Sequence, residues 1–475
     1  MINRRDFLKS VGVGASAFAF GLKRDVWAEE SKEKRPNIVL IFTDDQPQNA
    51  MGCMGNKVIS TPNMDKLAAE GVLFENSFVT TSICCCSRAS LLTGQHMARH
   101  GINSFEKPLS AEQWDQTYPV LLRKAGYRTA FLGKLAVGAP KTQPPELCLP
   151  VDRFDMWYGF PQGISFIQNV DGKKRYLTTV MEEKVAQFLK EQPKEQPFLI
   201  VMALKEPHGP LDMEDPDLPP NLVKGEIPRP KTLTQEAFDK LPVEIRKSLN
   251  GVEPGPKFLK PRSLTDESAY QKNMAQGYRY ISRADIAVGR IMAALKEQGF
   301  DNNTVVIHTS DNGSMNGAHR LVGKWNMYEE SIRVPYIIRD PRLPEAKGVR
   351  RTQMVLNIDL APTMLAMAGV PVPAGMQGID LQPVLRDPKA PGREEWYYEH
   401  DIVGLSKNMP CPRCEGVRTE RWKYIHYKDT QPVVEELFDL KADPMEEHDL
   451  AKDPAHAETL AGLRAKCDEY RRKLR

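Results

Sequence analysis

The stretch Ile38-Val39-Leu40-Ile41-Phe42-Thr43-Asp44-Asp45 decides the fold, because it places a run of apolar residues just before two aspartates. A continuous apolar run without polar alternation is typical of a parallel strand that is buried on both faces. In open α/β sheets, ligand sites form beyond the carboxyl ends of such strands. The stretch therefore predicts a buried strand that ends at a polar site.

Strands and helices alternate outward from this strand. Apolar runs predict strands at residues 129–132, 198–204, 304–308 and 334–338, and helical patterns cover residues 61–71, 87–93, 117–125 and 270–298. This alternation predicts an α/β fold with a doubly wound, mostly parallel sheet flanked by helices. After Gly369 the pattern changes to short antiparallel strands at 416–418 and 422–427 and a charged helix at 458–472. We therefore expect a main domain at 36–369 and a smaller C-terminal α+β domain at 370–475.

Composition agrees with a soluble globular protein of two domains. The 475 residues are 41% hydrophobic and 27% charged, and the formal net charge is only +3. Such a small charge gives no reason to expect a nucleic-acid partner. The 37 prolines indicate long irregular connections and argue against an all-helical bundle.

The first 28 residues resemble an export signal. Arg4 and Arg5 precede Asp6-Phe7-Leu8-Lys9, an apolar stretch covers residues 11–22, and Val26-Trp27-Ala28 fits a cleavage site. A twin arginine in this context indicates a Tat signal peptide at 1–28, with the Tat export machinery as a partner and a periplasmic or secreted destination. An uncleaved membrane anchor is the alternative, although the apolar stretch is too short to span a bilayer.

Polar side chains follow the carboxyl ends of several predicted strands, and we expect them to converge at one edge of the sheet. They are Asp44, Asp45, Lys134, His208, Asp311 and Asn312. The aspartates and the asparagine form an all-oxygen set, which suits Ca²⁺ or Mg²⁺ better than Zn²⁺. Alone, an Asp-Asp pair is more often a turn or a helix cap. The second acidic element, at Asp311, makes a metal site the better interpretation.

Three consecutive cysteines, Cys84 to Cys86, stand at a predicted helix start with Arg88 four residues after the first. The positive electrostatic environment of a helix N-terminus beside an arginine favours a reactive thiolate, although three buried structural cysteines fit the composition equally well. Cys411 and Cys414 form a single C-x-x-C, for which a local disulfide is a simpler interpretation than half of a zinc site.

The cysteine segment also resembles a known family. Cys-x-x-Ser-Arg at 84–88, followed by Ala-Ser-Leu-Leu-Thr-Gly at 89–94, is similar to the defining motif of the type I sulfatases of the alkaline phosphatase superfamily. The resemblance extends to five further segments in the same order, at 38–46, 133–134, 207–210, 309–313 and 323–335. Six ordered motifs are far more specific than any one of them.

This resemblance implies a sulfate-ester hydrolase whose catalytic domain is 36–369. It implies that a maturation enzyme oxidises Cys84 to formylglycine, whose hydrated aldehyde attacks sulfur, with Arg88 in support. It implies Ca²⁺ more readily than Mg²⁺, held by Asp44, Asp45, Asp311, Asn312 and residue 84. Lys134 and Lys324 would bind the sulfate, and His208 would protonate the leaving alcohol.

Two departures from the family pattern and one further candidate residue stand out. Cys86 stands where the maturation motif usually has Pro or Ala, and Leu135-Ala136 replaces a usual Trp-His, whose histidine serves the nucleophile. His319 lies near Lys324, where the family often has a histidine that contacts substrate, so we include it as a substrate-binding candidate.

The substrate that best fits an exported member of this family is a sulfated carbohydrate. Two alternatives remain open, a phosphodiester or phosphonate hydrolase of the same superfamily and a catalytically weak protein that binds sulfated glycans. The long proline-rich segment after Pro210 and the C-terminal domain would shape the substrate pocket.

Overall fold

The computed structural model describes residues 34–138, 149–161, 163–209, 215, 218–248, 264, 266–402 and 412–474. The predicted signal peptide and Cys411 of the C-x-x-C pair lie outside these residues. Strand β1 (Asn37–Asp44) is the deciding stretch, and all eight of its residues are buried. None of the helices among the described residues is long and apolar enough to cross a membrane.

An eight-stranded sheet surrounds β1, with the order β11-β2-β10-β9-β1-β8-β4-β5. Its other strands are β2 (Val72–Phe74), β4 (Arg128–Lys134), β5 (Met156–Phe160), β8 (Phe198–Pro207), β9 (Thr304–Ser310), β10 (Tyr336–Arg339) and β11 (Val349–Arg351). Strand β1 pairs in parallel with β8 on one side and with β9 on the other. In this register Ile41 lies opposite Met202 of β8 and opposite His308 of β9. Strand β10 runs antiparallel to β9 and β2. The predicted mostly parallel sheet is therefore confirmed.

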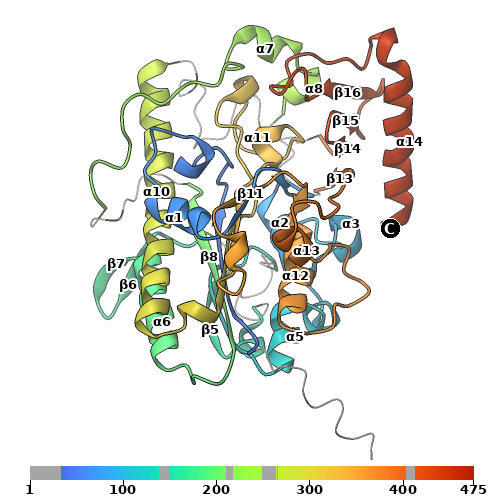
Figure 1. Cartoon of the computed structure of the whole chain (residues 1–475). Coiled ribbons are helices and arrows are strands. Elements are labelled where there is room, and N and C mark those ends of the chain that lie inside the picture. Colours follow the sequence, from blue (N-terminus) through green and yellow to red (C-terminus); the bar gives the residue numbers. More distant parts are fainter. Residues whose placement is uncertain are drawn as a thin grey trace, which may run out of the picture. The chain divides into compact units, whose positions relative to one another are not determined.

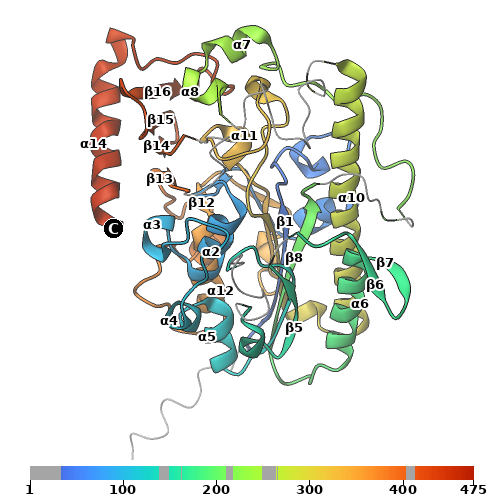
Figure 2. The same cartoon turned by 180° about the vertical axis from the view of Figure 1, so that it is seen from behind.

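Helices cover both faces of this sheet (Figure 1; Figure 2 shows the same from behind). One face packs against α1 (Pro62–Ala69), α6 (Leu177–Lys190) and α10 (Glu267–Glu297). The other packs against α2 (Cys84–Thr93), α5 (Tyr118–Lys124) and α12 (Leu360–Met367). A hydrophobic core lies on each face of the sheet, and alternate residues of β1 pack into one or the other. Val39 and Ile41 pack into the first core, and Leu40 and Phe42 into the second. This two-sided burial explains the unbroken apolar run in the sequence.

Shorter elements complete the main part of the chain. They are β3 (Ser77–Phe78), β6 (Ile167–Val170), β7 (Lys173–Tyr176), β12 (Val355–Leu356), α3 (Met97–His100), α4 (Ala111–Asp115), α7 (Gln235–Lys240), α8 (Val243–Arg246), α11 (Glu329–Ile332) and α13 (Gln382–Arg386). The sequence patterns did not predict β2, β5 or β11, because three-residue or half-exposed strands carry little hydrophobic signal.

The C-terminal part is a four-stranded antiparallel sheet with one long helix, of which the sequence predicts the two central strands and the helix. Its strands are β13 (Glu395–His400), β14 (Cys414–Thr419), β15 (Trp422–Tyr427) and β16 (Val434–Asp439), and its helix is α14 (Ala457–Lys473). One face packs on α14 through Val417 and Leu463. The other face packs on the main part of the chain through contacts that include Tyr398 and Met327.

Candidate active site

Four neighbouring strands bring the predicted polar residues to one edge of the sheet. The strands β9, β1, β8 and β4 are neighbours in the sheet, and each ends at or just before one of these polar residues. Strand β1 ends at Asp44, β4 ends at Lys134, and His208 follows β8. Asp311 and Asn312 follow β9. The shared direction of these strands places all of these side chains together, as we expected.

Gly133 makes the turn that brings Lys134 into this group. Its φ is +102°, and a Cβ there would lie 2.0 Å from the carbonyl oxygen of Ala203 in the neighbouring strand β8. A residue with a side chain would need both a strained backbone and a shift of the strand. Glycine before the lysine is therefore required by the geometry of β4.

Cys84 is the first residue of α2 and is 1% exposed. Its Sγ lies 3.2 Å from Asp44 Oδ1, 3.6 Å from Lys134 Nζ and 2.9 Å from Lys324 Nζ. Two ammonium groups and a carboxylate thus surround the sulfur atom. The arrangement can hold an anionic group of tetrahedral shape against whatever nucleophile residue 84 carries.

Each lysine is also paired with an acidic residue. Lys134 Nζ binds Asp44, and Lys324 Nζ binds Asp45. Burial opposes the charge of Lys324, but Asp45 and the other acidic groups raise its pKa well above the ordinary value. Burial would lower the pKa of Lys134, but Asp44 and Cys84 together outweigh it, so that pKa is also raised. Both lysines are therefore permanent cations at the site.

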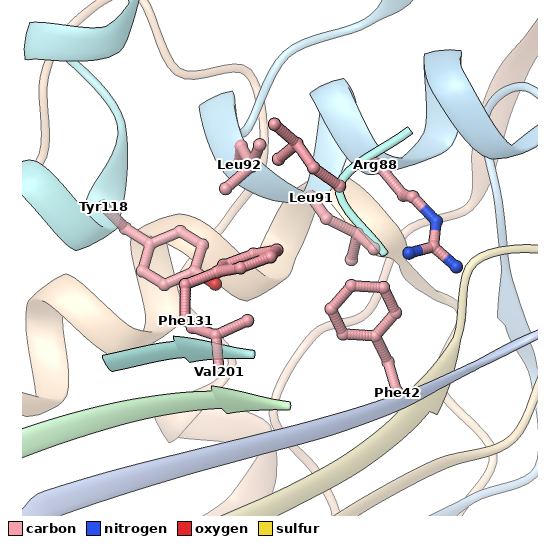
Figure 3. A pocket seen from close by; sticks show the side chains of 8 residues that line it. Phe42, Arg88, Leu91, Leu92, Tyr118, Phe131 and Val201 are labelled. Carbon is pink, nitrogen blue, oxygen red and sulfur yellow. The ribbon is translucent and has the colours of Figure 1, made fainter. Parts of the chain in front are cut away.

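Arg88 joins the acidic residues from the α2 side. Its Nε donates to Asp311 Oδ2 at 2.6 Å, its Nη2 lies 3.3 Å from Asp44 Oδ2, and its Nη1 donates to the carbonyl oxygen of Lys134. Behind the guanidinium lies a small cavity of about 10 Å³, which is room for about one water molecule. Figure 3 shows the side chains around it, which are Phe42, Leu91, Leu92, Tyr118, Phe131, Leu135 and Val201 besides Arg88. Because these neighbours are mostly apolar, the charge of Arg88 is directed toward Asp44 and Asp311.

His208 stands at the open side of the cluster. Its side chain is 38% exposed, whereas that of Lys324 is 6% exposed, and its Nε2 lies 3.9 Å from Asp45 Oδ2. Desolvation lowers the pKa of His208, with Lys134 contributing in the same direction. A half-exposed imidazole beside the buried charges is suitably placed to exchange a proton with a group that enters from solvent.

The acidic residues fit a hard divalent cation. Ligand atoms of Asp44, Asp45, Asp311 and Cys84 all lie within 4.8 Å of one another. Asn312 Nδ2 donates to Asp45 Oδ1 at 2.6 Å, while its Oδ1 is buried without a hydrogen-bond partner. A buried amide oxygen beside three carboxylates is a donor set that Ca²⁺ or Mg²⁺ prefers. Burial, together with Asp44, raises the pKa of Asp311 to about 6, which a bound cation would reverse.

Of the two interpretations left open for Cys84, a buried and protonated thiol fits the structure better than a reactive thiolate. Burial, and next the charge of Asp44, raise the pKa of the Cys84 thiol far above its ordinary value. The sequence argument relied on Arg88, but the guanidinium pairs with Asp311 and Asp44. As a thiol, residue 84 would stay protonated and weakly nucleophilic at neutral pH.

His319 lies in a second cluster. It is 1% exposed, stacks on Tyr328 with ring centroids 4.9 Å apart, and groups with Glu330 and Glu446 within 4.8 Å. Lys423 Nζ lies 2.6 Å from Glu446 Oε1 in the same region. The structure therefore groups His319 with Glu330 of α11 and with Glu446 of the C-terminal part.

The sequence patterns did not indicate Ser82 or Tyr398, although both lie next to the site. Ser82 Oγ donates to the carbonyl oxygen of Ser331 at 2.7 Å, and Tyr398 donates its hydroxyl to the carbonyl oxygen of Trp325 at 2.7 Å. Neither residue belongs to a motif or has a charge, so only their contacts reveal them.

Comparison with known proteins places this geometry in a family. A model of the sulfatase family matches residues 36–370, and a model described as the C-terminal part of N-sulphoglucosamine sulphohydrolase matches residues 317–473. The first match covers well over half of the chain. The chain therefore belongs to the sulfatase family and is a sulfuric ester hydrolase.

Individual relatives agree with this assignment. An N-acetylglucosamine-6-O-sulfatase of Bacteroides thetaiotaomicron is 31% identical over 88% of this chain and 83% of its own length. An arylsulfatase of Clostridium perfringens is 29% identical, over 90% of this chain and 93% of its own length.

A solved structure in complex with its substrate D-glucosamine-2-N,6-O-disulfate is similar, with a TM-score of 0.76 and 27% identity, over 93% of this chain and 98% of the other. A phosphonate monoester hydrolase of Agrobacterium radiobacter has a TM-score of 0.75 at 24% identity, over 93% of this chain and 96% of its own, and so shares the fold.

Proposed function

We propose that this sulfatase hydrolyses sulfate esters of a sulfated carbohydrate, with formylglycine made from Cys84 and one Ca²⁺ ion. The observation that carries the proposal is the position of Cys84 Sγ, 2.9 Å from Lys324 Nζ and 3.2 Å from Asp44 Oδ1. Residue 84 thus meets both an anion-binding cation and the candidate metal ligands. The raised pKa of the Cys84 thiol, caused by burial, argues against a thiolate nucleophile.

The cation and the modified residue would supply what the unmodified side chains lack. When present, a hydrated aldehyde at position 84 would supply one hydroxyl as the nucleophile and a second hydroxyl whose deprotonation allows sulfate to be released, and Ca²⁺ would polarise the sulfate. Asp44, Asp45, Asp311 and Asn312 would hold the ion.

The remaining residues bind the sulfate and move the proton. Lys134 and Lys324 would offset the charge that develops on the sulfate oxygens. Arg88 holds Asp311 and the backbone of Lys134 in place through its fixed fork of donors. His208, at the open side, would give its proton to the departing alcohol of the sugar.

The carbohydrate part of the proposal is supported by two similar proteins. One is named as a sulfatase of N-acetylglucosamine, and the other is solved with a sulfated glucosamine. A panel of sulfated mono- and disaccharides, with a phosphonate monoester and a phosphodiester as controls, tests the class of substrate. We expect turnover of at least one sulfated sugar. Faster turnover of the phosphorus esters, or tight binding of sulfated sugars without turnover, would contradict the proposal.

Mass spectrometry of peptides from the native host tests the nucleophile. We expect an aldehyde at position 84 despite Cys86, whose Sγ donates to the carbonyl oxygen of Ile102 at 3.1 Å in the folded protein. Active protein with only a thiol at position 84 would exclude the mechanism.

We also propose that residues 1–28 direct export by the Tat route to the periplasm or beyond. The support is the arginine pair at 4 and 5 before Phe7-Leu8-Lys9 and the short apolar stretch. Replacing both arginines by lysine should leave precursor in the cytoplasm. Unchanged export of that variant would refute the Tat route and leave the sulfatase activity unaffected.

A further inference from the structure

The C-terminal sheet reaches the active site through the hydroxyl of Tyr398. This residue lies in β13 and is 0% exposed. Its hydroxyl oxygen accepts from the backbone N–H of Ser82 at 3.2 Å and donates to the carbonyl oxygen of Trp325 at 2.7 Å. A hydroxyl has one donor and two acceptor sites, so both bonds form at once. Tyr398 therefore bridges two segments that are far apart in the sequence.

Both bridged segments carry a residue of the site. Ser82 stands two positions before Cys84, and Trp325 directly follows Lys324. The backbone N–H of Trp325 also donates to the carbonyl oxygen of Ser82 at 3.1 Å. The bridge lies next to the pair formed by Lys324 Nζ and Cys84 Sγ, which are 2.9 Å apart.

Trp325 needs this support because its backbone is strained. Its φ is +85°, which a bulky residue adopts only when its surroundings hold it there. The Ser82 carbonyl holds its N–H, and the Tyr398 hydroxyl holds its carbonyl oxygen. Without that hydroxyl, the strained residue would lose one of these two restraints and could relax, and Lys324 would move with it.

We propose that Tyr398 is a positioning residue, whose hydroxyl sets the distance between residue 84 and the sulfate-binding lysine Lys324. The proposal rests on the sulfate-ester hydrolysis proposed above. A displacement of about 1 Å in a catalytic group can reduce a rate by about 10²-fold. Removal of the hydroxyl should therefore lower kcat and leave KM nearly unchanged, since the remaining contacts to the substrate are kept.

The neighbouring Tyr397 is a matched control. It is 2% exposed and lies in the same strand, but it faces the side that packs on α14. Its hydroxyl donates to Glu415 Oε2 at 2.7 Å. Tyr397→Phe thus removes a buried hydroxyl from β13 without disturbing the link between Ser82 and Trp325.

The experiment compares the full-length Tyr398→Phe and Tyr397→Phe variants with the wild type on a sulfated substrate that the wild type hydrolyses. Each rate is divided by the fraction of aldehyde at position 84, and calcium content and thermal stability are measured alongside. We expect kcat to fall about 10–100-fold in Tyr398→Phe and less than twofold in Tyr397→Phe. Both variants should lose similar thermal stability.

A double-mutant cycle tests whether Tyr398 acts through Lys324. In the Lys324→Met background, Tyr398→Phe should cause little further loss of kcat, because the residue to be positioned is absent. Independent, additive losses would overturn the positioning role.

Two other outcomes would decide against the proposal. Equal kcat in both tyrosine variants, or a Tyr398→Phe protein that cannot be recovered folded when Tyr397→Phe can, would make Tyr398 a residue of stability alone. An inactive wild type with aldehyde and calcium in place would instead overturn the proposed function, so the two failures are distinguishable.

Discussion

Lys324 Nζ lies 2.9 Å from Cys84 Sγ, although the two residues are 240 positions apart in the chain. Cys84 comes from the start of α2, and Lys324 from the connection between β9 and α11. Both side chains are buried. The pair joins the nucleophile position to a permanent cation.

Replacing Lys324 by Met should lower kcat/KM by about 10²–10³-fold, because a positive charge next to the developing charge of the sulfate is lost. Steady-state kinetics on a sulfated sugar measure this loss, with the aldehyde content checked by mass spectrometry. Lys190→Met, at the exposed end of α6, is the control and should keep full activity. Equal activity of both variants would remove Lys324 from the site.

Arg88→Met should destabilise the fold as well as the site. It would leave Asp311 without the donor that lies 2.6 Å away and remove a buried charge partner of Asp44. Breaking a buried ion pair costs about 3–5 kcal/mol of unfolding free energy. Urea unfolding measures it, with the exposed pair of Arg175 and Glu183 as a control, where Arg175→Met should cost much less because solvent screens the pair. A cost for Arg88→Met as small as that of the control would contradict the prediction.

Calcium should stabilise the protein, since it would bind the folded chain and not the unfolded one. We expect the Tm to be higher in excess CaCl₂ than in EDTA, and the difference to vanish in Asp311→Ala. Elemental analysis of the purified protein should show a matching loss of metal. The control is Asp266→Ala, at the start of α10, which should keep the calcium effect. An EDTA-treated protein with unchanged Tm and activity would argue against the ion.

Glu436 should make stability depend on pH. Burial raises its pKa from 4.5 to about 8, although Tyr328 and Tyr427 donate hydrogen bonds to it. Because the folded-state pKa is the higher one, its stabilising contribution is complete below about pH 4.5 and is lost as the pH rises toward 8. Glu436→Gln keeps the neutral form at every pH, so its Tm relative to the wild type should rise between pH 5 and 8. A constant Tm difference over that range would show that Glu436 is charged in the folded protein.

Asp285 should stabilise the main domain, because it binds the start of α1 from a distant segment of the chain. It is 1% exposed, and its carboxylate accepts from the backbone N–H groups of Asn63 and Met64 at the start of α1, at 2.9 Å and 2.7 Å. Thr61, the residue at the cap of α1, makes no such side-chain bond. Asp285→Ala should therefore cost about 1–3 kcal/mol, because buried donors lose their partner. Chemical unfolding measures this cost, and Asp301→Ala should be near neutral.

The sequence by itself determined the elements with strong patterns and the chemistry at their ends. The unbroken apolar run of β1 predicted a strand buried on both faces, and the acidic pair after it was expected at the ligand-binding edge. The ordered motifs around Cys84, His208 and Lys324 were enough to name the family. These features are local in the chain, so local patterns reveal them.

Only the tertiary structure decided what depends on contacts between distant segments. The sequence left open whether Arg88 activates a thiolate at Cys84; in the structure Arg88 pairs with Asp311 and Asp44, and burial raises the pKa of the Cys84 thiol. His319 lies near Lys324 in sequence but packs with Glu330 and Glu446. Tyr398 has no motif at all, and its hydroxyl matters because it meets Ser82 and Trp325 across the fold. Burial and pairing are properties of the packed chain, and no local pattern of residues contains them.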